Sequence, residues 1–84
     1  MSTENFMMHA IHLAKIAFNQ NEVPVGAIIV KDGQVIGEGF NQVISKNSVA
    51  SHAEINAIND ASETLKNYRL NNCDMYVTLE PCHM

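Results

Sequence analysis

The chain has 84 residues, a net charge of −4, and 46% hydrophobic and 17% charged residues. This length allows one domain at most, and this composition is not that of an intrinsically disordered chain. Its five cations are scattered, so the charge pattern provides no electrostatic footprint for nucleic acid. The most apolar run, Val23 to Val30, is too short to span a membrane, and the N-terminus lacks the basic residues of a signal peptide, so we expect a cytoplasmic protein.

Helical periodicity predicts a first helix from about Glu4 to Asn19. The opposite face of this helix carries His9 and His12, which we expect to be solvated rather than to bind a metal. Its predicted apolar face consists of Met7, Ala10, Ile11, Ala14, Ala17 and Phe18.

Two strands are predicted next, Ala27 to Lys31 and Gln34 to Phe40, joined by "KDGQ", whose Asp-Gly pair is a strong hairpin signal. A polar loop then leads to a second helix from about Ser51 to Leu65. "DMYVTL" predicts a third strand, and Pro81 suits the first turn of a further helix. The apolar positions of the second helix are Ile55, Ala57, Ile58, Ala61 and Leu65.

The order α-β-β-α-β predicts an α/β fold with both helices packed on one sheet. The hairpin makes the first two strands antiparallel, and the helix between the second and third strands makes those two parallel. The simplest sheet then has the order 2-1-3. A disulfide between Cys73 and Cys82 is not expected, because the strand between them would hold the sulfurs about 20–30 Å apart.

The second helix opens with Ser51, His52 and Glu54. The pattern S-x-x-E is a capping box, and on this stretch alone the capping role of Glu54 is the favoured interpretation. A functional site would need His52 and Glu54 to act at the helix end, because residues two apart point to nearly opposite sides inside a helix. The helix dipole favours a bound hydroxide or thiolate at that end.

Cys82 follows the third strand and stands at the predicted start of a helix, where the pKa of a thiol falls. His52 follows the second strand. Because these strands are parallel, their carboxyl ends share one edge of the sheet, where sites form in open α/β sheets. The sequence therefore predicts a metal site that brings His52 and Cys82 together, with Glu54 beside them.

The segments "HAE" and "LEPC" resemble the H-x-E…P-C-x-x-C signature of zinc nucleobase deaminases, in the cytidine/deoxycytidylate deaminase superfamily. With "NEVPVGAIIV", "IGEGFN", "NYRL" and "YVTLEPCHM", the chain resembles the tRNA-specific adenosine deaminases. The resemblance implies a cytidine deaminase-like three-layer fold, of which residues 1–84 would be the N-terminal part of a single domain. The second cysteine of the signature would stand directly after Met84, so a fragment that lacks its third protein ligand is implied.

The resemblance also implies the roles of individual residues. His52 and Cys82 would bind Zn²⁺, which would activate a hydroxide to attack C6 of a flipped-out adenine. Glu54 would shuttle protons from the water to ring nitrogen N1 and to the departing ammonia. The product would be inosine at the tRNA wobble position, made by a full-length homodimer. The implied substrate contacts are Asn41, the Ala53 backbone N–H and Val25.

Two alternatives stay open. Deaminases of a free base or nucleoside such as guanine share the "HAE" and "PC" motifs, and the acidic charge favours them. The missing ligand instead favours a catalytically inactive remnant that binds no zinc. His83 is not expected to replace that ligand, because it adjoins Cys82 and reaching the same ion would strain the backbone. Tyr68 and Arg69 either contact RNA or pack within a connection.

Overall fold

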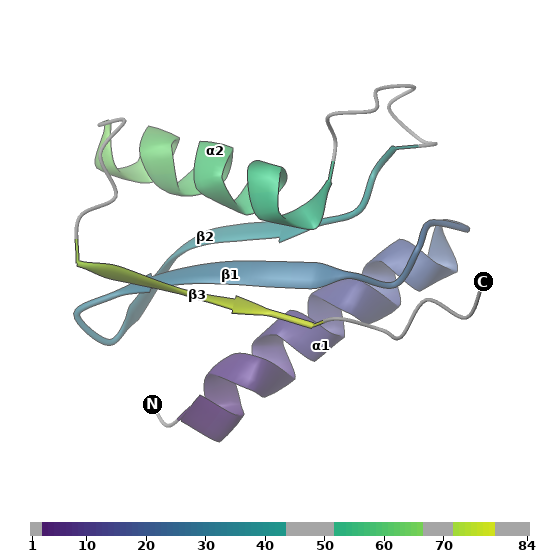
Figure 1. The fold of residues 1–84 in the computed structure, drawn as a ribbon, viewed down its shortest axis with the longest axis horizontal. Coiled ribbons are helices and arrows are strands. Elements are labelled where there is room, and N and C mark those ends of the chain that lie inside the picture. Colours follow the sequence, from purple (N-terminus) through teal and green to yellow (C-terminus); the bar gives the residue numbers. More distant parts are fainter. Residues whose placement is uncertain (1–2, 44–51, 67–71, 79–84) are drawn as a thin grey trace.

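The computed structural model describes residues 3–43, 52–66 and 72–78. Its elements, drawn in Figure 1, are α1 (Thr3–Asn19), β1 (Gly26–Lys31), β2 (Gln34–Phe40), α2 (Ala53–Leu65) and β3 (Cys73–Val77). The predicted order α-β-β-α-β is confirmed, with element bounds that shift by at most two residues. Neither helix in these ranges is long and apolar enough to cross a membrane. The further helix predicted at Pro81 lies outside the described residues.

The strand β1 lies at the centre of the sheet, whose order is β2-β1-β3. Both neighbours are antiparallel to β1, so β2 and β3 run in the same direction, as predicted. A central strand that is covered on both faces needs apolar residues without alternation. This explains why Gly26 to Val30 are all buried.

The Asp-Gly pair forms the predicted hairpin between β1 and β2. Asp32 has φ 51° and Gly33 has φ 77°, and a two-residue type I′ turn requires positive φ at both central positions. The register then shifts along the pair, since Val30 lies opposite Val35 but Ile29 lies opposite Gly37. The extra residue makes a bulge in β2.

The two helices cover opposite faces of the sheet, α2 above and α1 below in Figure 1. Successive residues of β1 alternate between these faces. Ala27 and Ile29 pack with α2, and Ile28 and Val30 pack with α1. The expected three-layer arrangement of helix, sheet and helix is therefore confirmed.

Glycines in β2 let α2 lie very close to the sheet. A Cβ atom on Gly37 would meet the carbonyl oxygen of Ala57 at 2.5 Å, and one on Gly39 would clash with the carbonyl oxygen of Ala53. The helix presents small side chains to this surface, since Ala53, Ala57 and Ala61 are all 0% exposed. This close approach positions the first turn of α2 directly over the end of β2.

The predicted apolar faces of both helices are wrong in part. On α1, Phe6 and Leu13 are buried although the prediction left them out. The prediction relied on the spacing of large apolar side chains. In the structure, the glycines of the sheet instead favour close contact with the face of α2 that carries alanines. The large apolar side chains that the helices leave exposed are Met8, Ile11, Phe18, Ile55 and Ile58.

Candidate functional site

His52 and Glu54 stand at the start of α2. His52 is the N-cap residue, with φ −82° and ψ 152°, and its side chain makes no capping hydrogen bond. It is exposed, whereas Glu54 is half-buried in the first turn. Both side chains therefore lie at the helix end, as a shared site requires.

The capping-box interpretation does not fit this helix start. A capping box places the glutamate three residues after a serine or threonine N-cap. Because the N-cap here is His52, Glu54 is only two residues after it, and the register is off by one. Ser51 lies outside the described residues. The position of Glu54 still suits a carboxylate, since the N-terminal end of a helix carries partial positive charge.

Asn41 supplies the cap that His52 does not. It follows β2 and is 8% exposed. Its side-chain Oδ1 accepts a hydrogen bond of 2.8 Å from the backbone N–H of Ala53, one of the donors that a helix start leaves without an intrahelical partner. The backbone N–H of Asn41 donates to the carbonyl oxygen of Val25 at 3.1 Å. These two bonds fix the end of β2 against the first turn of α2.

The predicted substrate contacts are neighbours in the structure although they come from three separate segments. Val25 is half-buried and packs against the core cluster that contains Ala53. Asn41 bonds to the backbone of both residues. All the predicted site residues except Cys82 thus gather where β2 ends and α2 begins.

Cys82 lies outside the described residues, so its convergence with His52 stays a prediction. The last described residue, Thr78, shows where β3 ends. Its backbone N–H donates to the carbonyl oxygen of Gly26 at 2.9 Å, and its Oγ1 accepts from the Gly26 N–H at 2.9 Å. Because Gly26 directly follows Val25, the carboxyl end of β3 is held beside the same site.

His52 fits a metal ligand, because it is exposed and makes no capping bond. Within residues 3–43, 52–66 and 72–78, no group of three or more His, Cys, Asp and Glu side chains could hold an ion. A catalytic zinc takes three protein ligands and keeps one position open. The described part therefore contributes His52, and Cys82 is the next candidate along the chain.

Three polar residues near the site were missed from the sequence. Thr78 and Glu22 are buried, at 9% and 5% exposure. Asn56 Nδ2 donates to the carbonyl oxygen of Phe40 at 2.9 Å. A polar residue at the end of an apolar strand is a signal that could have found Thr78. Nothing in a single sequence separates Asn56 from the other polar residues of α2.

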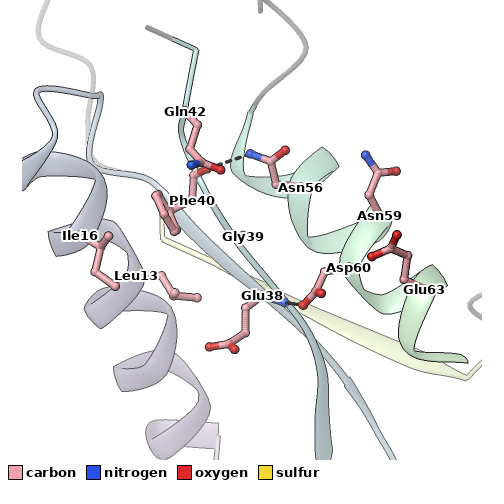
Figure 2. A pocket seen from close by; sticks show the side chains of 10 residues that line it. All are labelled: Leu13, Ile16, Glu38, Gly39, Phe40, Gln42, Asn56, Asn59, Asp60 and Glu63. Carbon is pink, nitrogen blue, oxygen red and sulfur yellow. Dashed lines mark hydrogen bonds between the residues drawn. The ribbon is translucent and has the colours of Figure 1, made fainter. Parts of the chain in front are cut away.

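The structure contains two grooves among the described residues that bear on the site. The larger, of about 630 Å³, lies along β2 between α1 and α2 (Figure 2) and shares no lining residue with the predicted site. The smaller, of about 300 Å³, is lined in part by Pro24 and Thr78. Pro24 precedes Val25 in the chain, and Phe40 and Gln42 of the larger groove flank Asn41, so each groove has lining residues next to the predicted site in sequence.

Comparison with known proteins identifies relatives along the whole chain. The family model described as the cytidine and deoxycytidylate deaminase zinc-binding region matches residues 1–84. A tRNA-specific adenosine deaminase of Buchnera aphidicola subsp. Schizaphis graminum is 48% identical over 79 residues, which cover 94% of this chain and 52% of that protein. The chain spans about half the length of the bacterial curated relatives it matches.

Two solved structures share the fold closely. One comes from studies of A-to-I editing by tRNA:A34 deaminases at the wobble position; it has a TM-score of 0.88 and 45% identity, covering 95% of this chain and 62% of that one. The other is guanine deaminase from Bacillus subtilis, with a TM-score of 0.89 and 42% identity, covering 99% of this chain and 54% of that one. The fold therefore does not distinguish between these two activities.

Proposed function

The chain belongs to the cytidine and deoxycytidylate deaminase zinc-binding family, and we propose that it forms the zinc- and base-binding part of a tRNA-specific adenosine deaminase. The proposed reaction is the hydrolysis of adenosine to inosine at the tRNA wobble position, with release of ammonia. Relatives of that name reach 48% identity to the chain, which supports the proposal. Since the chain spans about half their length, the activity is proposed for the whole enzyme that carries residues 1–84.

The observation that carries the proposal is the junction between β2 and α2. A buried hydrogen bond joins Asn41 to Ala53, and the exposed His52 and half-buried Glu54 stand on the same helix start. A potential metal ligand, a carboxylate and a side-chain amide thus lie within one turn of a helix N-terminus. Deamination of a base needs a metal site and a carboxylate that moves protons, and the amide of Asn41 is proposed to contact the base.

We propose His52 and Cys82 as zinc ligands, because imidazole and thiolate are the donors that zinc prefers. When bound, zinc makes hydroxide available near neutral pH. The capping arrangement favours this role for His52. The His52 side chain makes no capping hydrogen bond, so its ring nitrogens are not committed to the helix start.

Glu54 is proposed to move protons without binding the metal. It takes a proton from the attacking water and delivers it to ring nitrogen N1 of adenine. It then takes the proton of the hydroxyl group now on C6 and passes it to the amino group, which leaves as ammonia when the C–N bond breaks, so that a carbonyl oxygen remains on C6. Adenosine and one water therefore become inosine and one ammonia.

Asn41, Ala53 and Val25 are proposed to hold the purine. In the structure, the Ala53 N–H already donates to Asn41 Oδ1. A base that accepts from the same N–H must therefore share this donor or displace the asparagine oxygen. Val25 is half-buried next to both groups and offers an apolar wall.

Guanine deamination is the second candidate, because the Bacillus subtilis guanine deaminase matches this chain as well in fold as the tRNA deaminase does. The net charge of −4 gives no support for a polyanionic substrate. Two of the remaining proposals rest on resemblance alone, a tRNA substrate and a homodimer of the full-length enzyme. The proposals of no membrane and a cytoplasmic location rest on the short apolar run and the N-terminus without basic residues.

The test uses the full-length enzyme that carries residues 1–84, with three variants. Glu54→Gln removes the proton carrier and His52→Ala removes a ligand. Glu63→Gln is the matched control, because Glu63 is an exposed glutamate on the same helix. Each protein is assayed for inosine formation in a tRNA anticodon stem-loop, for guanine hydrolysis and for bound zinc.

Glu54→Gln is expected to keep its zinc and fold and to lose at least about 10²–10⁴-fold in turnover. His52→Ala is expected to lose the zinc as well, and Glu63→Gln to match the parent. Near-normal inosine formation by Glu54→Gln would reject the proton role. Guanine turnover without tRNA activity would establish the second candidate, and a parent enzyme with neither zinc nor turnover would establish an inactive remnant.

A further inference from the structure

Within residues 3–43, 52–66 and 72–78, the strand β2 forms one edge of the sheet, where unpaired backbone groups can template the addition of another strand. In an antiparallel pair, residues alternately direct their N–H and C=O groups toward the partner strand and away from it. The bond from the Asn41 N–H to the Val25 carbonyl sets this alternation. It leaves Glu38 and Phe40, at odd spacing from Asn41, with their backbone groups directed away from β1.

Two side chains of α2 occupy one outward group of each of these residues. Asp60 Oδ2 accepts a hydrogen bond of 2.9 Å from the Glu38 backbone N–H. Asn56 Nδ2 donates to the Phe40 carbonyl oxygen at 2.9 Å. The dashed lines of Figure 2 show both bonds, which reach from one helix to one strand edge. Asn56 and Asp60 can do this together because their i, i+4 spacing puts them on the same side of α2.

We propose that Asn56 and Asp60 close the β2 edge, so that a second copy of this chain cannot pair with it edge to edge. An added strand needs the outward N–H of Glu38 and the outward carbonyl of Phe40, and both are already used. The β2 strand of another copy is the competing partner, since it has the same length and the same alternation. The proposal is independent of the deaminase reaction, because neither side chain belongs to the proposed catalytic site.

Open space along β2 explains why the hydrogen bonds of Asn56 and Asp60 are needed to exclude an added strand. A groove of about 630 Å³ runs along the strand between the helices, so the helices themselves do not exclude an incoming strand. Two further features act in the same direction. His9 of α1 contacts the Glu38 carboxylate at the exposed surface beside this strand. The bulge before Gly37 interrupts the regular ladder that strand addition needs.

The test compares two double variants of the natural full-length protein that carries residues 1–84. Asn56→Ala with Asp60→Ala removes both edge bonds. Asn59→Ala with Glu63→Ala is the matched control: it also removes one amide and one carboxylate from α2, and neither of these residues bonds to β2 within the described residues. Both doubles change the net charge equally, and alanine favours the helix in each.

A third protein shows which edge is used. Glu38→Pro, added to the Asn56→Ala and Asp60→Ala double, removes the outward N–H for good. Because that N–H does not bond to β1, proline is compatible with this edge position. The measurements are sedimentation across a concentration series, circular dichroism to confirm the fold, and hydrogen exchange of the Glu38 amide.

We expect the Asn56 and Asp60 double to self-associate beyond the parent and to exchange the Glu38 amide about tenfold faster at low concentration, since a bond to a carboxylate is worth roughly one power of ten. The control double should behave as the parent, and Glu38→Pro should reverse the association. A folded double with the oligomeric state of the parent, or association that Glu38→Pro leaves intact, would overturn the proposal. If the Asn56→Ala and Asp60→Ala double variant does not fold, the two single variants are tested instead, and the same outcomes support or overturn the proposal.

Discussion

The side-chain oxygen of Asn41 and the backbone N–H of Ala53 form a hydrogen bond of 2.8 Å across the junction of β2 and α2. Both residues are buried, at 8% and 0% exposure, so water cannot readily replace the bond. The residue proposed to contact the purine therefore also holds the helix start that carries His52 and Glu54. Asn41 therefore combines an observed structural role with a proposed role in substrate binding.

Replacement of Asn41 is expected to separate the two roles. Asn41→Ala leaves the Ala53 N–H without its acceptor and should lower the free energy of unfolding by about 1–2 kcal/mol. Asn41→Asp keeps an acceptor and should retain most of that stability, although it loses the amide donors. Urea unfolding measures the stability of both Asn41 variants, and Asn59→Ala serves as a control at an exposed position. Equal stability of Asn41→Ala and the parent would mean that the cap contributes nothing.

Gly39→Ala is expected to push α2 away from the sheet. The added Cβ would clash with the carbonyl oxygen of Ala53 and lie close to the N–H of Ala57. These are backbone atoms, which cannot rotate out of the way, so we expect a loss of at least about 2–3 kcal/mol in stability. Urea unfolding checks the loss. Wild-type stability would show that the helix can move without cost.

Gly33→Ala tests the turn by backbone conformation alone. Gly33 has φ 77°, and nothing lies within 4 Å of the position that a Cβ would take. The expected cost is about 1 kcal/mol, from the positive φ that an L-residue disfavours. Asp32→Asn is the control and should be nearly neutral, because asparagine tolerates the φ of 51° at that position. Thermal unfolding of the two variants gives the comparison.

Thr78→Val is expected to loosen the end of β3. Valine has nearly the shape of threonine but no oxygen to accept from the buried Gly26 N–H, which now donates to Thr78 Oγ1 at 2.9 Å. We expect a loss of about 1–2 kcal/mol, and Thr78→Ser should recover most of it. Unfolding by urea distinguishes the two. A stable valine variant would make the hydroxyl dispensable.

Cys82 is expected to bind the same ion as His52, with its sulfur within about 4–5 Å of a ring nitrogen. Cobalt in place of zinc gives a direct readout, because thiolate ligation produces a near-ultraviolet charge-transfer band. In the full-length enzyme the band should weaken in Cys82→Ser, because only the second cysteine of the signature would still bind the ion, while His52→Ala should weaken cobalt binding. A band of unchanged intensity in Cys82→Ser, with Cys73→Ser as the matched control, would assign the thiolate elsewhere.

Several features could be predicted because they depend on residues close together in sequence. The Asp-Gly turn could be predicted because it depends only on positive φ at two adjacent positions, which Asp32 and Gly33 tolerate. The helix between β2 and β3 set their common direction, and the position of His52 after β2 placed it at a strand end. Cys82 was predicted in the same way, and it lies outside the described residues.

Other features depend on which segments meet, and the sequence misjudged or missed them. The spacing of Ser51 and Glu54 suggested a capping box, whereas the helix starts one residue later and takes its cap from Asn41. The large residues Ile11 and Phe18 were expected in the core, whereas both are exposed. On α2, Ile55 and Ile58 were expected in the core and are exposed, because the glycines of β2 favour close contact with the small Ala53, Ala57 and Ala61, which a hydrophobicity pattern cannot show.

The sequence alone therefore determined the order of elements and the hairpin, because turn chemistry and periodicity act over short stretches of chain, and it proposed the residues of the candidate site from motif spacing and resemblance. Only the tertiary structure decided which side chains hold the site and the sheet edge together. The bonds from Asn41 to Ala53 and from Asp60 to Glu38 join residues far apart in sequence. Such bonds form only after the close packing of α2 on β2, at Gly37 and Gly39, has brought the two elements within hydrogen-bonding distance.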